Sequence, residues 1–167
     1  MKKYVFLAAC GLLLAACYKA DTTDGPAPVA AGFDQAFTLQ YRQEAELPLR
    51  QSPELTIGLA DLSYSFCPPN AMCFAPDFVA PTLRITDAQG LTREVKMPAF
   101  GHEPRNQGWI DSTSIRANSR RYVLYYTSWN TSWNRRKATS STWITSKNSI
   151  NSQKQGITVQ LRVAKPN

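Results

Sequence analysis

The residues that could support catalysis are few and lie far apart in the chain. The single histidine, His102, stands beside Glu103 in a loop-like stretch, where a side chain usually faces solvent. No nucleophile elbow, zinc-binding helix or phosphate-loop pattern is present. Asp61 and Asp77 are the one carboxylate pair that a tight loop could bring together, but acids at strand ends usually face water. The sequence therefore predicts a protein that is not an enzyme and that uses no metal or cofactor.

The N-terminus carries the parts of a secretory signal. Met-Lys-Lys precedes an apolar stretch, residues 4–16, which is too short to cross a hydrocarbon layer of about 30 Å. Leu14-Ala15-Ala16-Cys17 resembles the bacterial lipobox, which is cleaved before a cysteine that receives lipid. The resemblance implies that residues 1–16 are a lipoprotein signal peptide and that Cys17 is the lipidation site. Residues 7–10 fit the same pattern with a shorter apolar core, and an ordinary secreted protein is the alternative.

The segment after the signal is predicted to be a flexible tether. Residues 17–32 are small and polar and include Gly25, Pro26 and Pro28, which is typical of a flexible linker. Tyr18 follows the cysteine, and the sorting rule for enteric lipoproteins then implies the outer membrane. The expected partner is the membrane, reached through lipid on Cys17, with the protein facing either the periplasm or the cell surface.

Two cysteines remain for the folded part of the chain. Residues 33–167 are expected to form a single domain, large enough to bury a core. With Cys10 removed and Cys17 lipidated, Cys67 and Cys73 are an even pair in an oxidising compartment, which favours a disulfide. Their spacing lacks the Cys-x-x-Cys redox pattern, and no second pair completes a zinc site.

Apolar and polar residues alternate with a period of two in most of this domain. Leu55, Ile57 and Leu59 show the pattern, and Pro81 in a later strand predicts an edge or a bulge. The expected strands lie at 37–41, 47–49, 54–60, 79–85, 91–97, 115–117, 122–129 and 156–164. The fold class is therefore predicted to be all-β, an antiparallel β-sandwich of roughly seven to nine short strands with little helix.

The order of these patterns carries a family resemblance. Phe-x-Leu, Leu-Thr-Ile-x-Leu, Ser-x-Cys-Pro-x4-Cys and a last strand ending in Val-x-x-Pro resemble a group of uncharacterised small bacterial lipoproteins. The resemblance covers residues 37–102 and the last strand, and it implies a sandwich-like domain in the cell envelope. Those relatives usually carry Asp-Ser-Arg before the first cysteine and Trp-x-Gly after the second. This chain has residues 64–66 and 74–76 there, so roles of those positions do not transfer.

Charge is divided between two parts of the chain. Residues 18–111 hold twelve acids and seven bases, whereas residues 112–167 hold no acid and ten bases. Inside the basic part, residues 127–134 repeat Thr-Ser-Trp-Asn, within an insertion at about 128–155 that is rich in Ser, Thr, Asn and Trp. The candidate ligand-binding residues are Trp129, Trp133, Trp143, Arg135, Arg136 and Lys137.

Two interpretations of these residues stay open. In one, the tryptophans belong to the core or its edge and the charges are solvated. In the other, rings and cations form a surface that binds a polyanion or a glycan. A period of four puts Trp129 and Trp133 on one strand face with polar Thr131 between them, which favours the surface.

The sequence thus predicts a membrane-anchored envelope lipoprotein that acts as a binding or structural module, with no specific nucleic-acid ligand. The alternative is a protease-inhibitor-like domain that uses the stapled turn at residues 68–72. The basic part could instead dock on the acidic part of the same or a neighbouring molecule. Residues 21–23 and 111–113 also resemble O-glycan acceptor triplets, which often arise by chance.

Overall fold

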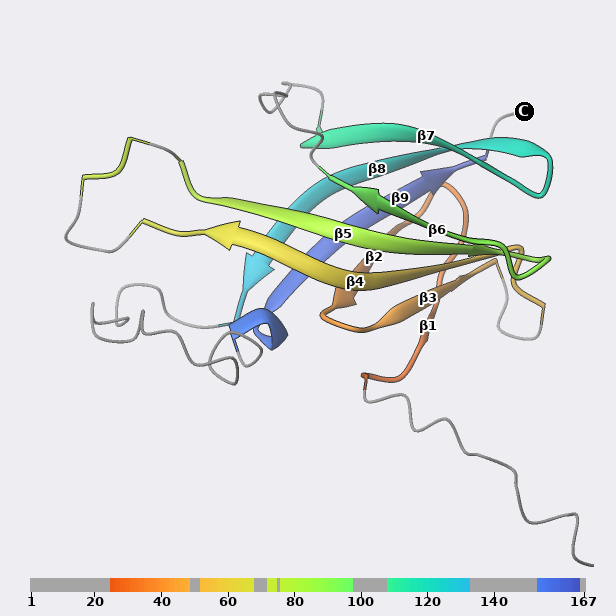
Figure 1. Cartoon of the computed structure of the whole chain (residues 1–167), viewed down its shortest axis with the longest axis horizontal. Coiled ribbons are helices and arrows are strands. Elements are labelled where there is room, and N and C mark those ends of the chain that lie inside the picture. Colours follow the sequence, from red (N-terminus) through yellow and green to blue (C-terminus); the bar gives the residue numbers. More distant parts are fainter. Residues whose placement is uncertain are drawn as a thin grey trace, which may run out of the picture.

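The computed structural model describes residues 25–48, 52–67, 72–74, 76–97, 108–132 and 153–165. Within these residues nine strands form two sheets, and all but one of the strand pairs are antiparallel (Figure 1). One sheet has the order β1-β3-β4-β5-β6 and the other has the order β2-β9-β8-β7. The strands are β1 (Val29–Ala30), β2 (Ala36–Gln40), β3 (Glu44–Leu47), β4 (Leu55–Ser65), β5 (Phe78–Asp87), β6 (Thr92–Lys96), β7 (Asp111–Ala117), β8 (Arg120–Thr131) and β9 (Ile157–Ala164). The predicted all-β sandwich is confirmed.

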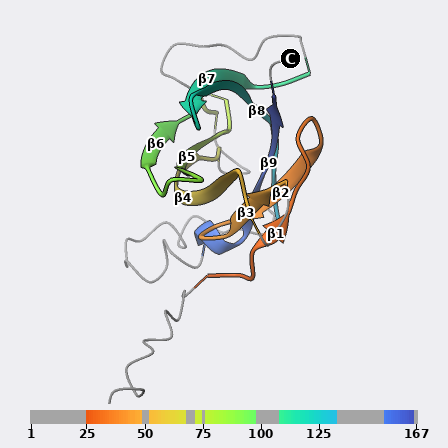
Figure 2. The ribbon, with the colours of Figure 1, turned by 90° about the vertical axis from the view of Figure 1, so that its right-hand side faces the viewer.

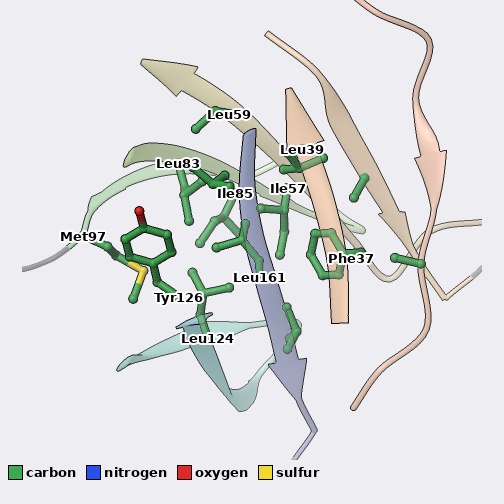
Figure 3. Close-up of a cluster of buried hydrophobic side chains, with 14 of the residues drawn as sticks. Phe37, Leu39, Ile57, Leu59, Leu83, Ile85, Met97, Leu124, Tyr126 and Leu161 are labelled. Carbon is green, nitrogen blue, oxygen red and sulfur yellow. The ribbon is translucent and has the colours of Figure 1, made fainter. Parts of the chain in front are cut away.

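The core lies between the two sheets. Figure 2 looks roughly along the strands and shows the sheets enclosing one interior. Alternate residues of each strand point into it, so Ile157, Val159, Leu161 and Val163 of β9 are all fully buried. Figure 3 shows side chains from both sheets meeting there, among them Tyr126. The apolar residues of the period-2 pattern in the sequence are therefore the ones that are buried.

The β4–β5 hairpin forms the long central pair of strands in the first sheet. Its ladder runs from Leu55 opposite Asp87 to Ser65 opposite Phe78, with a register shift between Leu59 and Asp61. Pro81 lies where the pairing of β5 with β6 ends: its carbonyl accepts from the amide of Met97, but it has no N–H to return the bond. Pro81 was predicted to mark an edge or a bulge, and it lies at a local edge, because residues 78–81 of β5 pair with β4 alone.

Three boundaries differ from the sequence prediction. Val29 and Ala30, inside the expected tether, form β1 and pair in parallel with β3, so ordered structure begins before residue 33. The second strand, β3, precedes Pro48 and does not surround it. Leu91, the first residue of the strand expected at 91–97, is 64% exposed because it lies in the connection before β6.

The β7–β8 hairpin is longer than the sequence indicated. Asn118 and Ser119 both have positive φ, 50° and 59°, as a two-residue hairpin turn of type I′ requires. β8 continues to Thr131, so the start of the predicted insertion is strand. A register shift between Tyr126 and Ser128 makes Thr127 a bulge, and this bulge decides where Trp129 points.

Candidate functional site

Glu54 joins the acidic and basic parts of the chain at one end of the sandwich. Its carboxylate accepts hydrogen bonds from Lys165 Nζ, at 2.8 Å, and from the hydroxyl of Tyr122, and it lies 3.7 Å from Arg120 Nη1. The Lys165 and Tyr122 hydrogen bonds hold the pKa of Glu54 below its usual value, although partial burial opposes them. Burial, followed by the bond to Glu54, raises the pKa of Tyr122. The cluster ties β8 and the end of β9 to the start of β4.

Asp61 makes a similar contact near the other end. Lys154, in the helical turn at residues 153–155, donates to Asp61 Oδ1 and also lies over the ring of Tyr41, 5.5 Å from its centroid. Burial raises the pKa of Asp61, but the Lys154 hydrogen bond, a backbone bond from Leu62 and nearby positive charge outweigh it, so the pKa is lowered. Beside this pair, the Tyr64 hydroxyl donates to Gln153 Oε1 at 2.8 Å.

We expect Glu54→Gln to reduce the acid sensitivity of the fold. The pKa of Glu54 is lowered by folding, so its stabilisation is complete above the unfolded-state pKa and is lost as pH falls through the folded-state value. At neutral pH the variant should be less stable by about 1–2 kcal/mol, and the difference from the original protein should shrink below about pH 4. Denaturant unfolding across pH measures this. Glu94→Gln, in an exposed pair with Arg84, is the matched control and should change stability by about 0–1 kcal/mol. A difference in the free energy of unfolding between Glu54→Gln and the original protein that stays constant across pH would contradict the prediction.

The remaining described bases of residues 112–165 lie on the outer surface of the sheet β2-β9-β8-β7. Arg116 of β7 lies directly opposite Arg121 of β8, and both are exposed. Arg121 Nη2 donates to Ser114 Oγ at 2.8 Å, which draws its guanidinium across β7. None of the three arginines Arg116, Arg121 and Arg162 makes an ion pair with another described residue.

Arg162 is held by an aromatic pair on the same surface. Its guanidinium carbon lies 4.4 Å from the ring centroid of Tyr125, the residue opposite it on β8. Trp109, just before β7, contacts Tyr125 edge-on with centroids 5.1 Å apart. We call these five residues, Arg116, Arg121, Arg162, Tyr125 and Trp109, the arginine–aromatic face.

Acidic side chains are absent from the described outward positions of these four strands. Asp111 is the one acid within them, and it is buried on the inner side, where its Oδ1 accepts from the Ser112 amide. The outer surface of the other sheet is mixed, since Arg84 there pairs with Glu94 at 3.5 Å. The charge division in the sequence therefore becomes a difference between the two sheets.

Of the predicted ligand-binding residues the structure describes Trp129 alone, and it does not lie on this face. Trp129 pairs with buried Val159, and its ring lies 5.5 Å from that of Phe66 against the edge of the core. This is the core-edge position of the first interpretation. The other candidates, Trp133, Trp143, Arg135, Arg136 and Lys137, lie outside the described residues, as do Cys17 and His102.

The disulfide between Cys67 and Cys73 is present, with Cα atoms 5.9 Å apart. Asp77 Oδ1 accepts from the Cys67 amide at 2.6 Å, so this carboxylate fixes the base of the stapled loop. Asp61 is bound to Lys154, so the two carboxylates that could have formed a catalytic pair each have another role. Residues 68–71, the core of the proposed inhibitor loop, lie outside the described part of the chain.

No family model, curated protein or solved structure matches this chain. Its function must be inferred from the site itself. In the described residues no three His, Cys, Asp or Glu side chains gather as a metal site would require, and no helix there is long and apolar enough to cross a membrane. Sequence reasoning named none of the five residues of the face as a site; the usable signal was that Tyr125 and Arg162 each stand between apolar residues of an alternating strand.

Proposed function

We propose that this chain is a lipid-anchored cell-envelope protein whose β-sandwich binds polyanions or anionic glycans through the arginine–aromatic face. The observation that carries the proposal is the gathering of two aromatic rings with three arginines that make no ion pair with a described residue, on a sheet surface whose described outward positions hold no acid. The proposal gives the chain no catalytic role. It keeps the ligand class predicted from the sequence and moves the binding residues from the insertion to the sheet.

The ion pairs of the domain support this choice of residues. Lys154, Lys165 and Arg120 are paired with Asp61 and Glu54 from the acidic part of the chain. These three cations are therefore neutralised by carboxylates of the same chain. The arginines of the face lie on a different surface, where their charge is available to an anion from solution.

The opposition of Arg116 and Arg121 also points to a ligand. Like charges directly opposite each other across two strands destabilise a sheet, and no acid among the described residues pairs with either of them. A bound sulfate, phosphate or carboxylate group would relieve this repulsion. Arginine suits the task because its planar guanidinium can donate two parallel hydrogen bonds to such a group.

The dimensions of the face favour a polymer over a small anion. Tyr125 and Arg121 are four residues apart on β8, which corresponds to about 13 Å along the strand. Arg162 lies one strand away from Tyr125, about 5 Å across the sheet. A single small anion cannot span this distance, whereas a chain with repeated negative groups can contact both arginine positions. Tyr125 and Trp109 offer ring faces or edges to the sugars of a glycan.

Retention on immobilised heparin tests the proposal. The mature protein should be retained above physiological salt, and Arg116→Ser/Arg121→Ser/Arg162→Ser should elute at clearly lower salt. The slope of log K against log salt should fall by about one for each arginine that contacts the polymer. A matched control, Arg42→Ser/Arg84→Ser/Lys96→Ser, removes the same charge from other exposed positions and should elute close to the original protein.

Two further sets of variants identify the binding residues and the class of ligand. If Arg135→Ser/Arg136→Ser/Lys137→Ser abolishes retention while the change to the face does not, the insertion binds the ligand and the face proposal is wrong. Trp109→Ala/Tyr125→Ala should weaken binding to heparin, which contains sugar rings, more than binding to inorganic polyphosphate, which has none. Equal weakening of both would restrict the proposal to polyanions. Elution of the original protein at or below physiological salt would overturn it altogether.

A further inference from the structure

The tip of the β4–β5 hairpin exposes large apolar side chains. Met72 and Phe74 are fully exposed, with relative values of 101% and 110%, and Phe78 at the start of β5 is 43% exposed. Figure 1 shows this hairpin projecting well beyond the neighbouring strands. Among the described residues, the only other exposed large apolar side chain is Leu91, at the opposite end of β5. We call Met72, Phe74 and Phe78 the apolar tip.

The base of the tip is held in place. The Cys67–Cys73 disulfide limits its width, and the bond from the Cys67 amide to Asp77 closes it from the other side. Just below, Phe66 packs on Tyr64 and Trp129, with ring centroids 5.3 and 5.5 Å away. The exposed side chains therefore stand on a hairpin whose base is fixed by these contacts.

The tip carries almost no charge. From Leu62 to Ala80 the sequence holds one charged residue, Asp77, and its Oδ1 is turned back toward Cys67. A surface of Met and Phe side chains without exposed cations or anions suits an apolar medium, because burying it requires no desolvation of charge. Exposed apolar surface of this kind marks an interaction site.

The described N-terminal chain meets the domain beside the middle of β4, well short of the tip (Figure 1). Gly25 lies against the backbone of Arg42, and the Arg42 amide donates to the Leu59 carbonyl at 2.9 Å. From Leu59, β4 runs a further six residues to Ser65, about 20 Å toward the tip. Cys17 is eight residues before Gly25, so the connecting chain spans at most about 29 Å. Lipid on Cys17 would thus hold a membrane within reach of the tip.

We propose that the apolar tip inserts into the interfacial layer of the same membrane that holds the lipid on Cys17. This inference rests on the proposed lipid anchor. The insertion gives the domain a second, reversible membrane contact and so sets its orientation, with Met72 and Phe74 at the depth of the headgroup and acyl boundary. A lipid chain fixes position alone, whereas two separate contacts also limit rotation.

Photolabelling of the full-length lipidated protein tests the inference. The protein is reconstituted in phosphatidylcholine vesicles that contain a phosphatidylcholine carrying a photoreactive acyl chain. These lipids have no net charge, so the arginine–aromatic face contributes no attraction. We expect label on Met72, Phe74 and Phe78 and none on Leu91, which serves as the internal control. Equal labelling at Leu91, or no label at the tip, would overturn the inference.

A variant with a weakened tip completes the test. Met72→Ser/Phe74→Ser should reduce label on Phe78 at least tenfold, since each buried side chain contributes a factor of ten or more to partitioning. Leu91→Ser should leave the label unchanged, and titration of free thiols verifies that the disulfide still forms. Unchanged label at Phe78, or chain-to-chain crosslinks through the tip in place of lipid label, would contradict insertion. Mass spectrometry of the same sample reports lipid on Cys17. An unmodified Cys17 would refute the lipid anchor. Whether the tip inserts would then still be decided by comparing the label on the tip with the label on Leu91.

Discussion

Replacing Tyr126 by Ala is expected to lower the free energy of unfolding by about 3–5 kcal/mol. The Tyr126 ring is fully buried between the sheets, among apolar side chains of both (Figure 3). Its hydroxyl donates to the Val79 carbonyl at 2.9 Å, which links β8 of one sheet to β5 of the other. Burial also raises the pKa of Tyr126, so the hydroxyl stays protonated and donating over the whole physiological range. Ala would leave both a cavity and an unsatisfied carbonyl.

The adjacent residue supplies the control for this prediction. Tyr125→Ala removes the same side chain from the outer surface of the same strand and should cost about 1 kcal/mol or less. Tyr126→Phe removes only the hydroxyl and should cost about 1–2 kcal/mol, because Val79 loses its partner inside the core. Denaturant unfolding gives all three values. A similar loss of stability for Tyr125→Ala and Tyr126→Ala would mean that Tyr126 does not lie on the buried face of β8.

Cys17→Ala is expected to abolish membrane attachment. Bacterial lipoproteins carry their lipid on the thiol of this cysteine, so a fatty-acid analogue should label the original protein and fail to label the variant. Two or three acyl chains contribute about 0.8 kcal/mol for each buried methylene, so the unlabelled variant should move into the soluble fraction. Metabolic labelling followed by fractionation measures both effects.

Cys10→Ala is the matched control for the anchor. The lipobox resemblance of residues 7–10 is weaker because the apolar stretch before it is shorter. This variant should be labelled like the original protein. Label that persists in Cys17→Ala and disappears in Cys10→Ala would move the anchor to Cys10 and shift the predicted cleavage site.

The division of charge along the chain has two consequences in the fold. Cations at the ends of β8 and β9 meet Glu54 and Asp61 and hold the two sheets together. Cations at outward positions within the strands remain on the arginine–aromatic face. Whether a basic residue pairs with a carboxylate or stays on the face depends on its position along its strand. A count of charges in the sequence does not give that position.

Much of the fold could be predicted from local pattern. Strands with one buried face alternate polar and apolar residues, so β4, β5 and β9 were readable from side-chain types alone. The cysteine pair likewise predicted its disulfide. β1 was not predicted, because two residues carry no periodicity and their partners in β3 lie sixteen residues further along the chain. β7 was underestimated, because its outward Ser and Arg residues hide the buried Ile115.

The position of Trp129 depends on a contact that local pattern does not contain. Strict alternation from buried Tyr126 would place Trp129, three residues later, on the outer surface. The bulge at Thr127 inserts one extra residue, so Trp129 pairs with buried Val159 and faces inward. The strands, the disulfide and the excess of basic residues could be inferred from the sequence, because they follow from residue types and short-range spacing. The arginine–aromatic face was decided by the tertiary structure, because strand register and a single bulge set which side chains meet on one surface.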